Sequence, residues 1–315
     1  MKAIVNEKFG KASLVMKLQQ VEKPVPSEQQ VLVKIHATSV NTIDCVFRSG
    51  KKAIFGLARL STGIRKPKMK ILGFDISGEV VEVSNQVSDF KVGDKVFGHA
   101  LTGGNAEFAL ASVNEIAKKP QNITHQEAAA IPMAALSALQ GLRLIHIQPG
   151  SEILIYGASG GIGTYAVQLA KQFGLHVTAV TSAKNEQLVR RLGAEDFIDY
   201  RTEDFTSKGK KYDIIFDTVA KVPNWKIGLK ESGVFISAGS PSMSMIGFFG
   251  SILGNKLRKK KFLNFNTKYS KSDLEYLAQL TEAGSLKSEI DKSTLSNKYL
   301  KPMNTMNKVI QLEKL

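Results

Sequence analysis

The chain has 315 residues, of which 43% are hydrophobic and 23% are charged, so we expect a globular protein of two ordinary domains. Its one cysteine, Cys45, excludes a disulfide within the chain and every zinc site built from several cysteines. A single cysteine fits a reducing compartment, and we expect a cytoplasmic protein. The N-terminus lacks the apolar core of a signal peptide, and no apolar run approaches the roughly 20 residues of a membrane-spanning helix.

The net charge of +15 leaves several kinds of partner open. An anionic cofactor, a negatively charged surface and a lysine-rich solvated exterior all fit it. The sequence contains no recognised nucleic-acid motif and no aromatic stacking platform, so we expect no nucleic-acid partner.

Residues 1–120 are rich in strand patterns. The segments 31–37, 78–83 and 90–98 each read as a strand, and glycine or proline turns separate them. Short strands with such turns predict a compact, partly open barrel. The basic, glycine-interrupted segment 51–70 is expected to be a loop.

The pattern changes near Pro120. Thr124 and Glu127 have the spacing of a capping box, which marks the start of a helix. The alanine-rich segment 128–144 is predicted to be helical and leads into the next unit.

Residues 152–180 predict a nucleotide-binding βαβ unit. The strand at Ile153–Ile155 is followed by the glycine turn 157–163, a helix at Tyr165–Phe173 and a second strand at 175–180. A tight turn without side chains lets backbone amides approach a pyrophosphate at the helix N-terminus. The alternative is a glycine turn needed only for packing. The expected cofactor contacts in the turn are Ala158, Ser159, Gly160, Gly161, Ile162 and Gly163.

Further alternation of helix and strand follows this unit. We expect a helix at 184–192 and strands at 196–199, 212–217 and 233–238. This order is typical of a doubly wound parallel sheet, so the predicted fold class is α/β.

The end of the second strand indicates which nicotinamide cofactor is bound. A site that prefers NAD needs Asp or Glu there to bind the ribose 2′-hydroxyl. The chain instead has Thr181, Ser182 and Lys184, which suit a 2′-phosphate. We therefore expect NADPH, although Lys184 could also be a solvated lysine of the next helix.

Several motifs identify a family. They are NTID at 41–44 with RSG at 48–50, GFDISGEV at 73–80, VGDKVFG at 92–98, AAAIPMAALSAL at 128–139 and LGAEDFIDY at 192–200. Through them the chain resembles the zinc-independent quinone oxidoreductases of the medium-chain dehydrogenase/reductase superfamily over roughly residues 1–292.

The resemblance implies a GroES-like barrel domain at 1–120, completed by 266–315, and a Rossmann domain at 121–265. It also implies NAD(P)H in the cleft between them, hydride transfer to quinones or activated carbon–carbon double bonds, and often a homodimer.

The zinc-dependent relatives have metal ligands at three positions that differ here. By alignment of motifs these positions hold Asn41, Phe74 and Met133. Phenylalanine and methionine are not plausible zinc ligands in this setting, so we expect no metal.

The resemblance also implies the remaining cofactor contacts. Tyr200 would lie beside the adenosine phosphate, and Asn41 and Met133 would border the nicotinamide ring; a turn asparagine and a core methionine are the alternatives. We assign no catalytic residue, because Val46 stands where some relatives carry a tyrosine; Asn41 and Arg48 are cleft candidates, and water is the expected proton donor. The positions expected to face the nicotinamide after the later strands are Val219, Gly239 and Ser240.

The segment 245–265 combines apolar residues with a run of lysines and arginine. It could lie on an anionic membrane surface. Alternatively it forms a loop and helix that cover the substrate cleft, with lysines outward.

The tail after about residue 292 lacks the family pattern. Reading it one base out of frame permits, with one choice of synonymous codons, the string YPLKQIPEAHEYDEQGHTIGKV, which has that pattern; Met303–Asn304 and Met306–Asn307 each force Glu in that frame. We therefore hypothesise a one-base insertion or deletion near Asp291–Ser293.

These observations predict an NADPH-dependent oxidoreductase that reduces a quinone or an enone or enal without zinc. The alternatives are a non-catalytic NADPH-binding protein and a peripheral membrane protein with the same fold.

Overall fold

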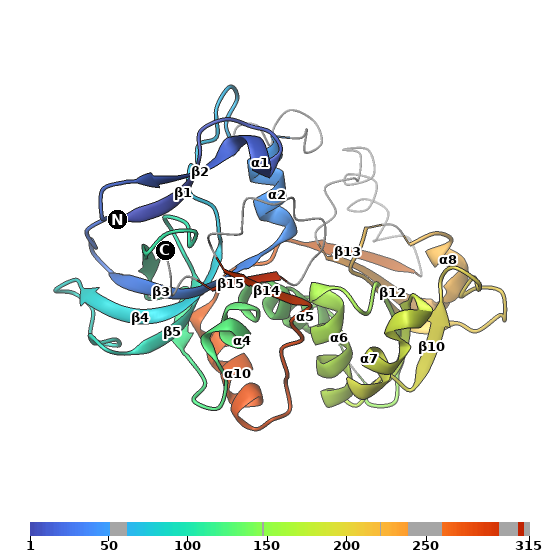
Figure 1. Cartoon of the computed structure of the whole chain (residues 1–315). Coiled ribbons are helices and arrows are strands. Elements are labelled where there is room, and N and C mark those ends of the chain that lie inside the picture. Colours follow the sequence, from blue (N-terminus) through green and yellow to red (C-terminus); the bar gives the residue numbers. More distant parts are fainter. Residues whose placement is uncertain (51–61, 147, 221, 239–259, 296–307, 312–315) are drawn as a thin grey trace. The chain divides into compact units, whose positions relative to one another are not determined.

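A computed structural model describes residues 1–50, 62–146, 148–220, 222–238, 260–295 and 308–311 (Figure 1). The chain forms two compact units, one of Met1–Met133 with Tyr269–Leu315 and one of Ala134–Lys268. None of the helices in the described ranges is long and apolar enough to cross a membrane.

The first unit is built around a mostly antiparallel sheet in the order β14-β15-β3-β4-β5-β7, with β6 also paired to β3. A separate two-stranded ribbon joins β1 and β2. Its apolar core includes Val33, Ile76 and Val96, which are inaccessible to solvent. The strands are β1 (Lys2–Asn6), β2 (Met16–Gln20), β3 (Gln30–Val40), β4 (Asp75–Val83), β5 (Lys95–His99), β6 (Phe108–Ser112), β7 (Ile116–Lys118), β14 (Lys292–Leu295) and β15 (Lys308–Gln311).

The strand patterns of the sequence correspond to long strands of this sheet. The segment 31–37 lies within β3 and 78–83 lies within β4. Within 90–98, the turn at Gly93, where φ is +91°, precedes β5. The predicted GroES-like barrel with a Rossmann partner is confirmed.

The predicted helix at 128–144 is wrong in one respect, because the structure divides it. α4 (His125–Ala129) ends before Ile131, and α5 (Pro132–Arg143) begins at Pro132. Proline has no backbone N–H, and its ring disfavours the helical conformation of the residue before it. α4 packs on β3 and β4, so the first unit extends beyond the boundary expected at residue 120.

In the described part of the first unit, the other helices are α1 (Ala12–Val15), α2 (Thr42–Ser49) and the longer α10 (Lys271–Glu282). α10 packs against β7 and buries Leu274, Leu277 and Ala278 on one face.

The second unit is a six-stranded sheet in the order β10-β9-β8-β11-β12-β13, with every neighbouring pair parallel. This arrangement confirms the doubly wound sheet. Its strands are β8 (Glu152–Tyr156), β9 (His176–Thr181), β10 (Asp196–Asp199), β11 (Tyr212–Asp217), β12 (Leu229–Ala238) and β13 (Lys261–Phe265), and its helices are α6 (Gly161–Gln172), η1 (Ala183–Asn185), α7 (Glu186–Arg191) and α8 (Trp225–Gly228).

Two predictions for this unit are corrected. The helix expected at 184–192 is a 3₁₀ turn, η1, followed by α7. Residues 261–265 form the edge strand β13 rather than part of a loop and helix, because alternate residues such as Phe262 pack on Phe235 of β12. The part of 245–265 before residue 260 lies outside the described residues.

Candidate active site

The glycine turn between β8 and α6 has the geometry of a phosphate-binding loop. Gly157 has φ of +84°, and its N–H and that of Ala158 donate to the carbonyl of Val180 at 3.0 and 3.1 Å. α6 then begins after Gly160, so its first amides have no acceptor within the helix. These amides, at the positive end of the helix dipole, form a site suited to an anion.

Two glycines of the turn are required by close contacts. A Cβ on Gly163 would lie 2.2 Å from the carbonyl oxygen of Gly157. A Cβ on Gly157 would lie 2.5 Å from Cγ1 of Val219 and 2.6 Å from Oγ1 of Thr218. The turn therefore lies directly against the loop that follows β11, as a dinucleotide-binding crevice at the carboxyl ends of the strands requires.

The loop after β11 is held in place by Asp217, which the sequence did not single out. Its Oδ1 accepts the N–H of Val219 at 2.9 Å and that of Ala220 at 2.8 Å. Thr218 Oγ1 donates to the carbonyl of Tyr156 at 2.8 Å. These bonds hold Ala220 in a left-handed conformation with φ of +58°.

The hydroxyl groups at the end of β9 are already hydrogen-bonded within the protein. Ser159 Oγ and Thr181 Oγ1 are 2.6 Å apart, and both Thr181 and Ser182 are only 4% exposed. Asn185 joins this group, because its Nδ2 donates to Ser159 Oγ at 2.9 Å. The structure thus links the glycine turn to the end of β9 through Asn185, a contact that the sequence analysis missed.

Lys184 and Tyr200 border the same edge and are exposed. The N–H of Tyr200 donates to the carbonyl of Thr181 at 3.3 Å, and the Arg201 guanidinium lies 5.8 Å from the Tyr200 ring centre. Positive charge and an aromatic ring are therefore present beside the end of β9. Gly239 and Ser240 lie outside the described residues.

In the first unit, Asn41 is part of a buried polar cluster. Its backbone N–H donates to Oδ2 of Asp44 at 2.8 Å, and its Nδ2 donates to Oδ2 of Asp75 at 2.9 Å. Asp75 also accepts the N–H of Met133 at 3.0 Å and the hydroxyl of Tyr269 at 2.7 Å. The structure thus brings the predicted residues Asn41 and Met133 to one carboxylate.

Asp44, Asp75 and Tyr269 of this cluster were not predicted as site residues. Asp44 lies in the NTID motif and Asp75 in GFDISGEV, which were the available signals for them; Tyr269 lies in no motif. Burial raises the pKa of Asp44 to about 7, opposed by hydrogen bonds from the N–H groups of Asn41 and Gly73. Burial also raises the pKa of Asp75, opposed by the donors on Tyr269, Asn41 and Met133.

The remaining predicted residues of the first unit lie close by in the chain. Phe74 contacts the ring of Phe47 edge-on at 5.3 Å and stacks on His99 at 6.0 Å. Arg48 lies in the last turn of α2, with its Nε buried and without a hydrogen-bond acceptor. Burial raises the pKa of Cys45, and the charge of Arg48 opposes that shift. Within the described ranges no group of three or more His, Cys, Asp or Glu residues could hold a metal ion.

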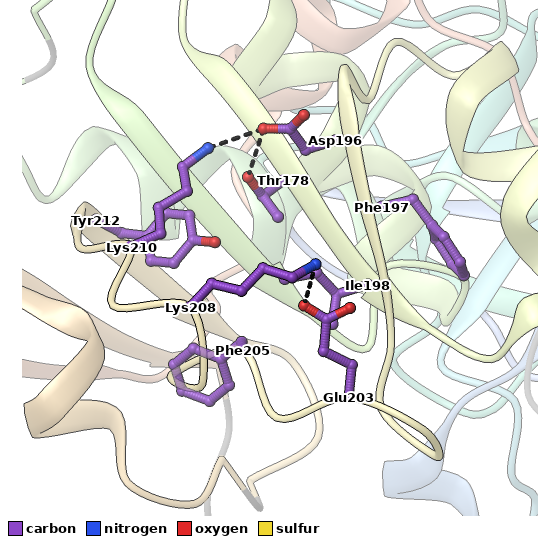
Figure 2. A pocket seen from close by; sticks show the side chains of 9 residues that line it. All are labelled: Thr178, Asp196, Phe197, Ile198, Glu203, Phe205, Lys208, Lys210 and Tyr212. Atoms are coloured by element: carbon purple, nitrogen blue, oxygen red, sulfur yellow. Dashed lines mark hydrogen bonds and ion pairs between the residues drawn. The ribbon is translucent and has the colours of Figure 1, made fainter.

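A pocket of about 210 Å³ lies elsewhere, over β9, β10 and the start of β11 (Figure 2). Its lysines are already paired: Lys208 with Glu203 at 2.8 Å and Lys210 with Asp196 at 2.8 Å. Its lining comes from β9, β10, the loop after β10 and the start of β11, and includes no residue of the glycine turn. This pocket is therefore separate from the dinucleotide-binding turn.

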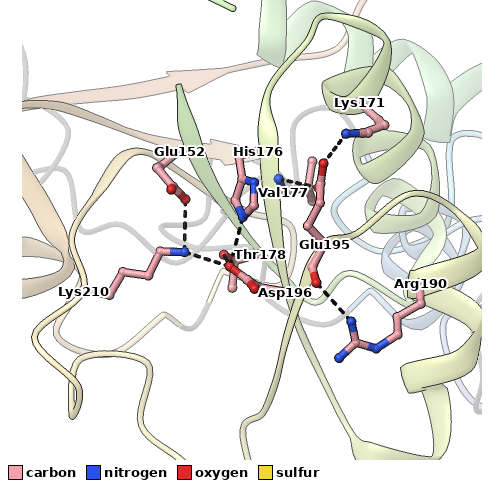
Figure 3. A network of polar contacts seen from close by, with 9 residues as sticks. All are labelled: Glu152, Lys171, His176, Val177, Thr178, Arg190, Glu195, Asp196 and Lys210. Atoms are coloured by element: carbon pink, nitrogen blue, oxygen red, sulfur yellow. Dashed lines mark hydrogen bonds and ion pairs between the residues drawn. The ribbon is translucent and has the colours of Figure 1, made fainter. Parts of the chain in front are cut away.

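The beginnings of these strands are joined by an ion-pair network (Figure 3). Lys210 also pairs with Glu152 at 3.1 Å, and His176 contacts Asp196 at 3.1 Å. Lys171 pairs with Glu195, whose side chain accepts the N–H of Val177. The network ties β8, β9 and β10 together on the side away from the glycine turn.

Known proteins match most of the chain. Residues 27–122 match the alcohol dehydrogenase GroES-like domain, and residues 192–296 match the zinc-binding dehydrogenase domain. The chloroplast envelope quinone oxidoreductase homolog of Arabidopsis thaliana is 33% identical, covering 92% of this chain and 90% of that protein. The mitochondrial NAD(P)H oxidoreductase RTN4IP1 of Bos taurus is 32% identical, over 93% of this chain and 83% of that protein. Among solved structures, the quinone oxidoreductase from Coxiella burnetii has a TM-score of 0.84 at 30% identity, covering 99% of both chains.

The two-unit fold and the glycine turn define a medium-chain dehydrogenase/reductase. The chain belongs to the quinone oxidoreductase-like family of that superfamily. It is accordingly an oxidoreductase that uses a nicotinamide cofactor.

Proposed function

We propose that the chain is an NADPH-dependent reductase that transfers a hydride to a quinone, or to the activated double bond of an enone or enal, without zinc. The observation that carries the proposal is the residue set Asn41, Phe74 and Met133 at the three positions aligned with zinc ligands. Without a Lewis acid there, an alkoxide intermediate of alcohol oxidation has no stabilisation. An acceptor that is already electrophilic needs none, and the quinone oxidoreductase relatives support this substrate class.

The residues of the second unit fit NADPH. The glycine turn lets backbone amides approach a pyrophosphate closely. A Cβ at Gly163 would disrupt the turn, because it would clash with the carbonyl oxygen of Gly157. The end of β9 carries Lys184 and the Asn185-linked hydroxyl groups where an NAD site would have an acid. When bound, NADPH would supply a hydride from C4 of its nicotinamide.

The chain contributes orientation rather than an evident general acid. The family resemblance assigns Val219, Asn41 and Met133 to the nicotinamide ring, and the loop after β11 holds Val219 in place. A hydride added to the β-carbon of an enone leaves an enolate, which takes its proton at the α-carbon from water. Orientation in a dry site would supply most of the rate acceleration.

The test is NADPH oxidation with a panel of 1,4-quinones and α,β-unsaturated carbonyl compounds, compared with NADH. We expect turnover with NADPH and at least one acceptor. Cofactor binding without oxidation of NADPH across the panel would contradict catalysis and favour a non-catalytic NADPH-binding protein. Sedimentation with anionic vesicles tests the membrane alternative for 245–265 separately.

The cofactor preference has its own test at Lys184. K184A should raise KM for NADPH about tenfold, because a charge-assisted hydrogen bond to the 2′-phosphate is lost. KM for NADH should stay unchanged. K211A, which removes an exposed lysine before β11, is the matched control. An equal change in both KM values would exclude recognition of the 2′-phosphate by Lys184.

A further inference from the structure

Asp75 is a fully buried carboxylate that is surrounded by hydrogen-bond donors. Its Oδ2 accepts Nδ2 of Asn41 at 2.9 Å, the N–H of Met133 at 3.0 Å and the hydroxyl of Ser39 at 3.2 Å. Its Oδ1 accepts the hydroxyl of Tyr269 at 2.7 Å. A buried acid is tolerated when its oxygens are satisfied in this way.

These donors suit the ionised form of Asp75. Nδ2 of Asn41 and the backbone N–H of Met133 both donate at these contacts, so both need an oxygen that accepts. A proton on Oδ2 of Asp75 would point toward these N–H groups and weaken both hydrogen bonds. The cluster is therefore complementary to a carboxylate.

The arrangement holds Asn41 through both its backbone and its side chain. Its backbone N–H is held by Asp44, and its Nδ2 is held by Asp75 and by Ser39 Oγ at 3.3 Å. The same residue forms the capping box of α2 with Asp44, so the Asn41 side chain is also tied to the start of that helix. A flip of the amide, which would exchange Nδ2 and Oδ1, would lose the hydrogen bonds from Nδ2 to Asp75 and to Ser39.

Tyr269 holds the other oxygen of Asp75. Burial and the charge of Asp75 raise the pKa of Tyr269 well above its ordinary value, so the hydroxyl stays a donor. The Tyr269 ring stacks on His99 with centroids 4.2 Å apart, and His99 Nδ1 lies 2.7 Å from Glu115 Oε2. The stack keeps the hydroxyl aimed at Asp75.

We propose that Asp75, held by Tyr269, is a positioning residue that fixes the orientation of the Asn41 amide in the reductase site. This inference rests on the proposed function and assigns a role to two residues that do not themselves touch the substrate. It predicts that Tyr269 affects the reaction only through Asp75 and Asn41.

A double-mutant cycle tests this role. Y269F keeps the ring stack and removes one hydrogen bond, so kcat should fall about fivefold with KM for NADPH unchanged. In an N41A background the same change should have no effect on kcat. Y276F, on α10, is the matched control and should leave kcat unchanged. A fall of equal size in both backgrounds, or no fall in Y269F, would overturn the proposal.

A second measurement does not depend on turnover. In protein labelled with ¹⁵N-asparagine, the side-chain NH₂ protons of Asn41 should exchange slowly, and Y269F should speed their exchange while Y276F should not. Unchanged exchange in Y269F would contradict the positioning role even if the chain reduced no acceptor. Slow, Tyr269-dependent exchange in a chain without turnover would support the positioning of Asn41 and contradict only the proposed reaction.

Discussion

At the residue scale, the glycines of the turn between β8 and α6 differ in how strictly the backbone requires them. Gly163 faces the carbonyl oxygen of Gly157, whereas a Cβ on Gly160 would have one neighbour, at 3.2 Å. The sequence motif shows a glycine at both positions and does not distinguish them. The distances show that the fold depends on Gly163 more strictly than on Gly160.

We expect G163A to lower the melting temperature of the cofactor-free protein by several degrees and to weaken NADPH binding, because the turn must open to admit the Cβ. G160A should leave the melting temperature nearly unchanged. Thermal unfolding without cofactor, followed by circular dichroism, compares the two. Equal melting temperatures for both variants would contradict the contact at Gly163.

Asp44 provides a pH dependence. Its pKa in the folded protein is about 7, against 3.8 when exposed, so between these values the folded state binds more protons than the unfolded state. Stability therefore falls as pH rises from about 4 to 7, by up to about 1.4 kcal/mol per pH unit. In D44N this contribution is absent.

The free energy of unfolding of the wild type minus that of D44N should thus decrease across this range and level off above pH 7. Urea denaturation at several pH values measures it. A difference that does not change with pH would show that Asp44 ionises in the folded protein as it does in the unfolded chain.

At the scale of elements, the start of α4 is fixed locally. Thr124 Oγ1 accepts the N–H of Glu127 at 3.2 Å, and the Glu127 carboxylate accepts the N–H of Thr124 at 2.8 Å. This is the capping box that the spacing predicted. The same helix ends at Ala129, three residues before Pro132, where the residue pattern alone predicts that it continues.

T124A should lower the free energy of unfolding by about 1 kcal/mol, because one N–H at the helix start loses its acceptor. T124S keeps the hydroxyl and should restore most of the loss. Urea denaturation of the three proteins measures the effect. A loss in T124S as large as that in T124A would indicate that packing of the threonine methyl group, rather than the cap, is responsible.

At the scale of the whole molecule, the tail bears on the completeness of the barrel. β15 pairs antiparallel with β3, with Lys308 opposite Val40 and Gln311 opposite Ala37. A strand at this position removes an exposed edge of the sheet. β15 lies after residue 292, so under the frameshift hypothesis its residues are not those of the evolved sequence.

If the hypothesis is correct, replacing the residues from 293 onward by YPLKQIPEAHEYDEQGHTIGKV should raise both the melting temperature and the rate of NADPH oxidation. A chain ending at residue 292 is the control. A reframed chain no more stable than that control would contradict the hypothesis, as would a gene whose shifted frame does not encode this string.

The sequence by itself determined the alternating strands and helices, the glycine turn and the lack of an acid after β9, because each is a local pattern of residue type and spacing. It also indicated the family, through motifs that are each only a short run of neighbouring residues. It could not predict β13, where an edge strand is stabilised by its pairing with β12 rather than by its own pattern.

Only the tertiary structure decided the surroundings of Asn41. Tyr269 and Asp75 are separated by 194 positions, and Met133 reaches the same carboxylate through a backbone N–H that has no signature in sequence. Which donors meet a buried acid depends on how distant segments pack, since the cost of burial can be met by any donor that the fold brings within reach.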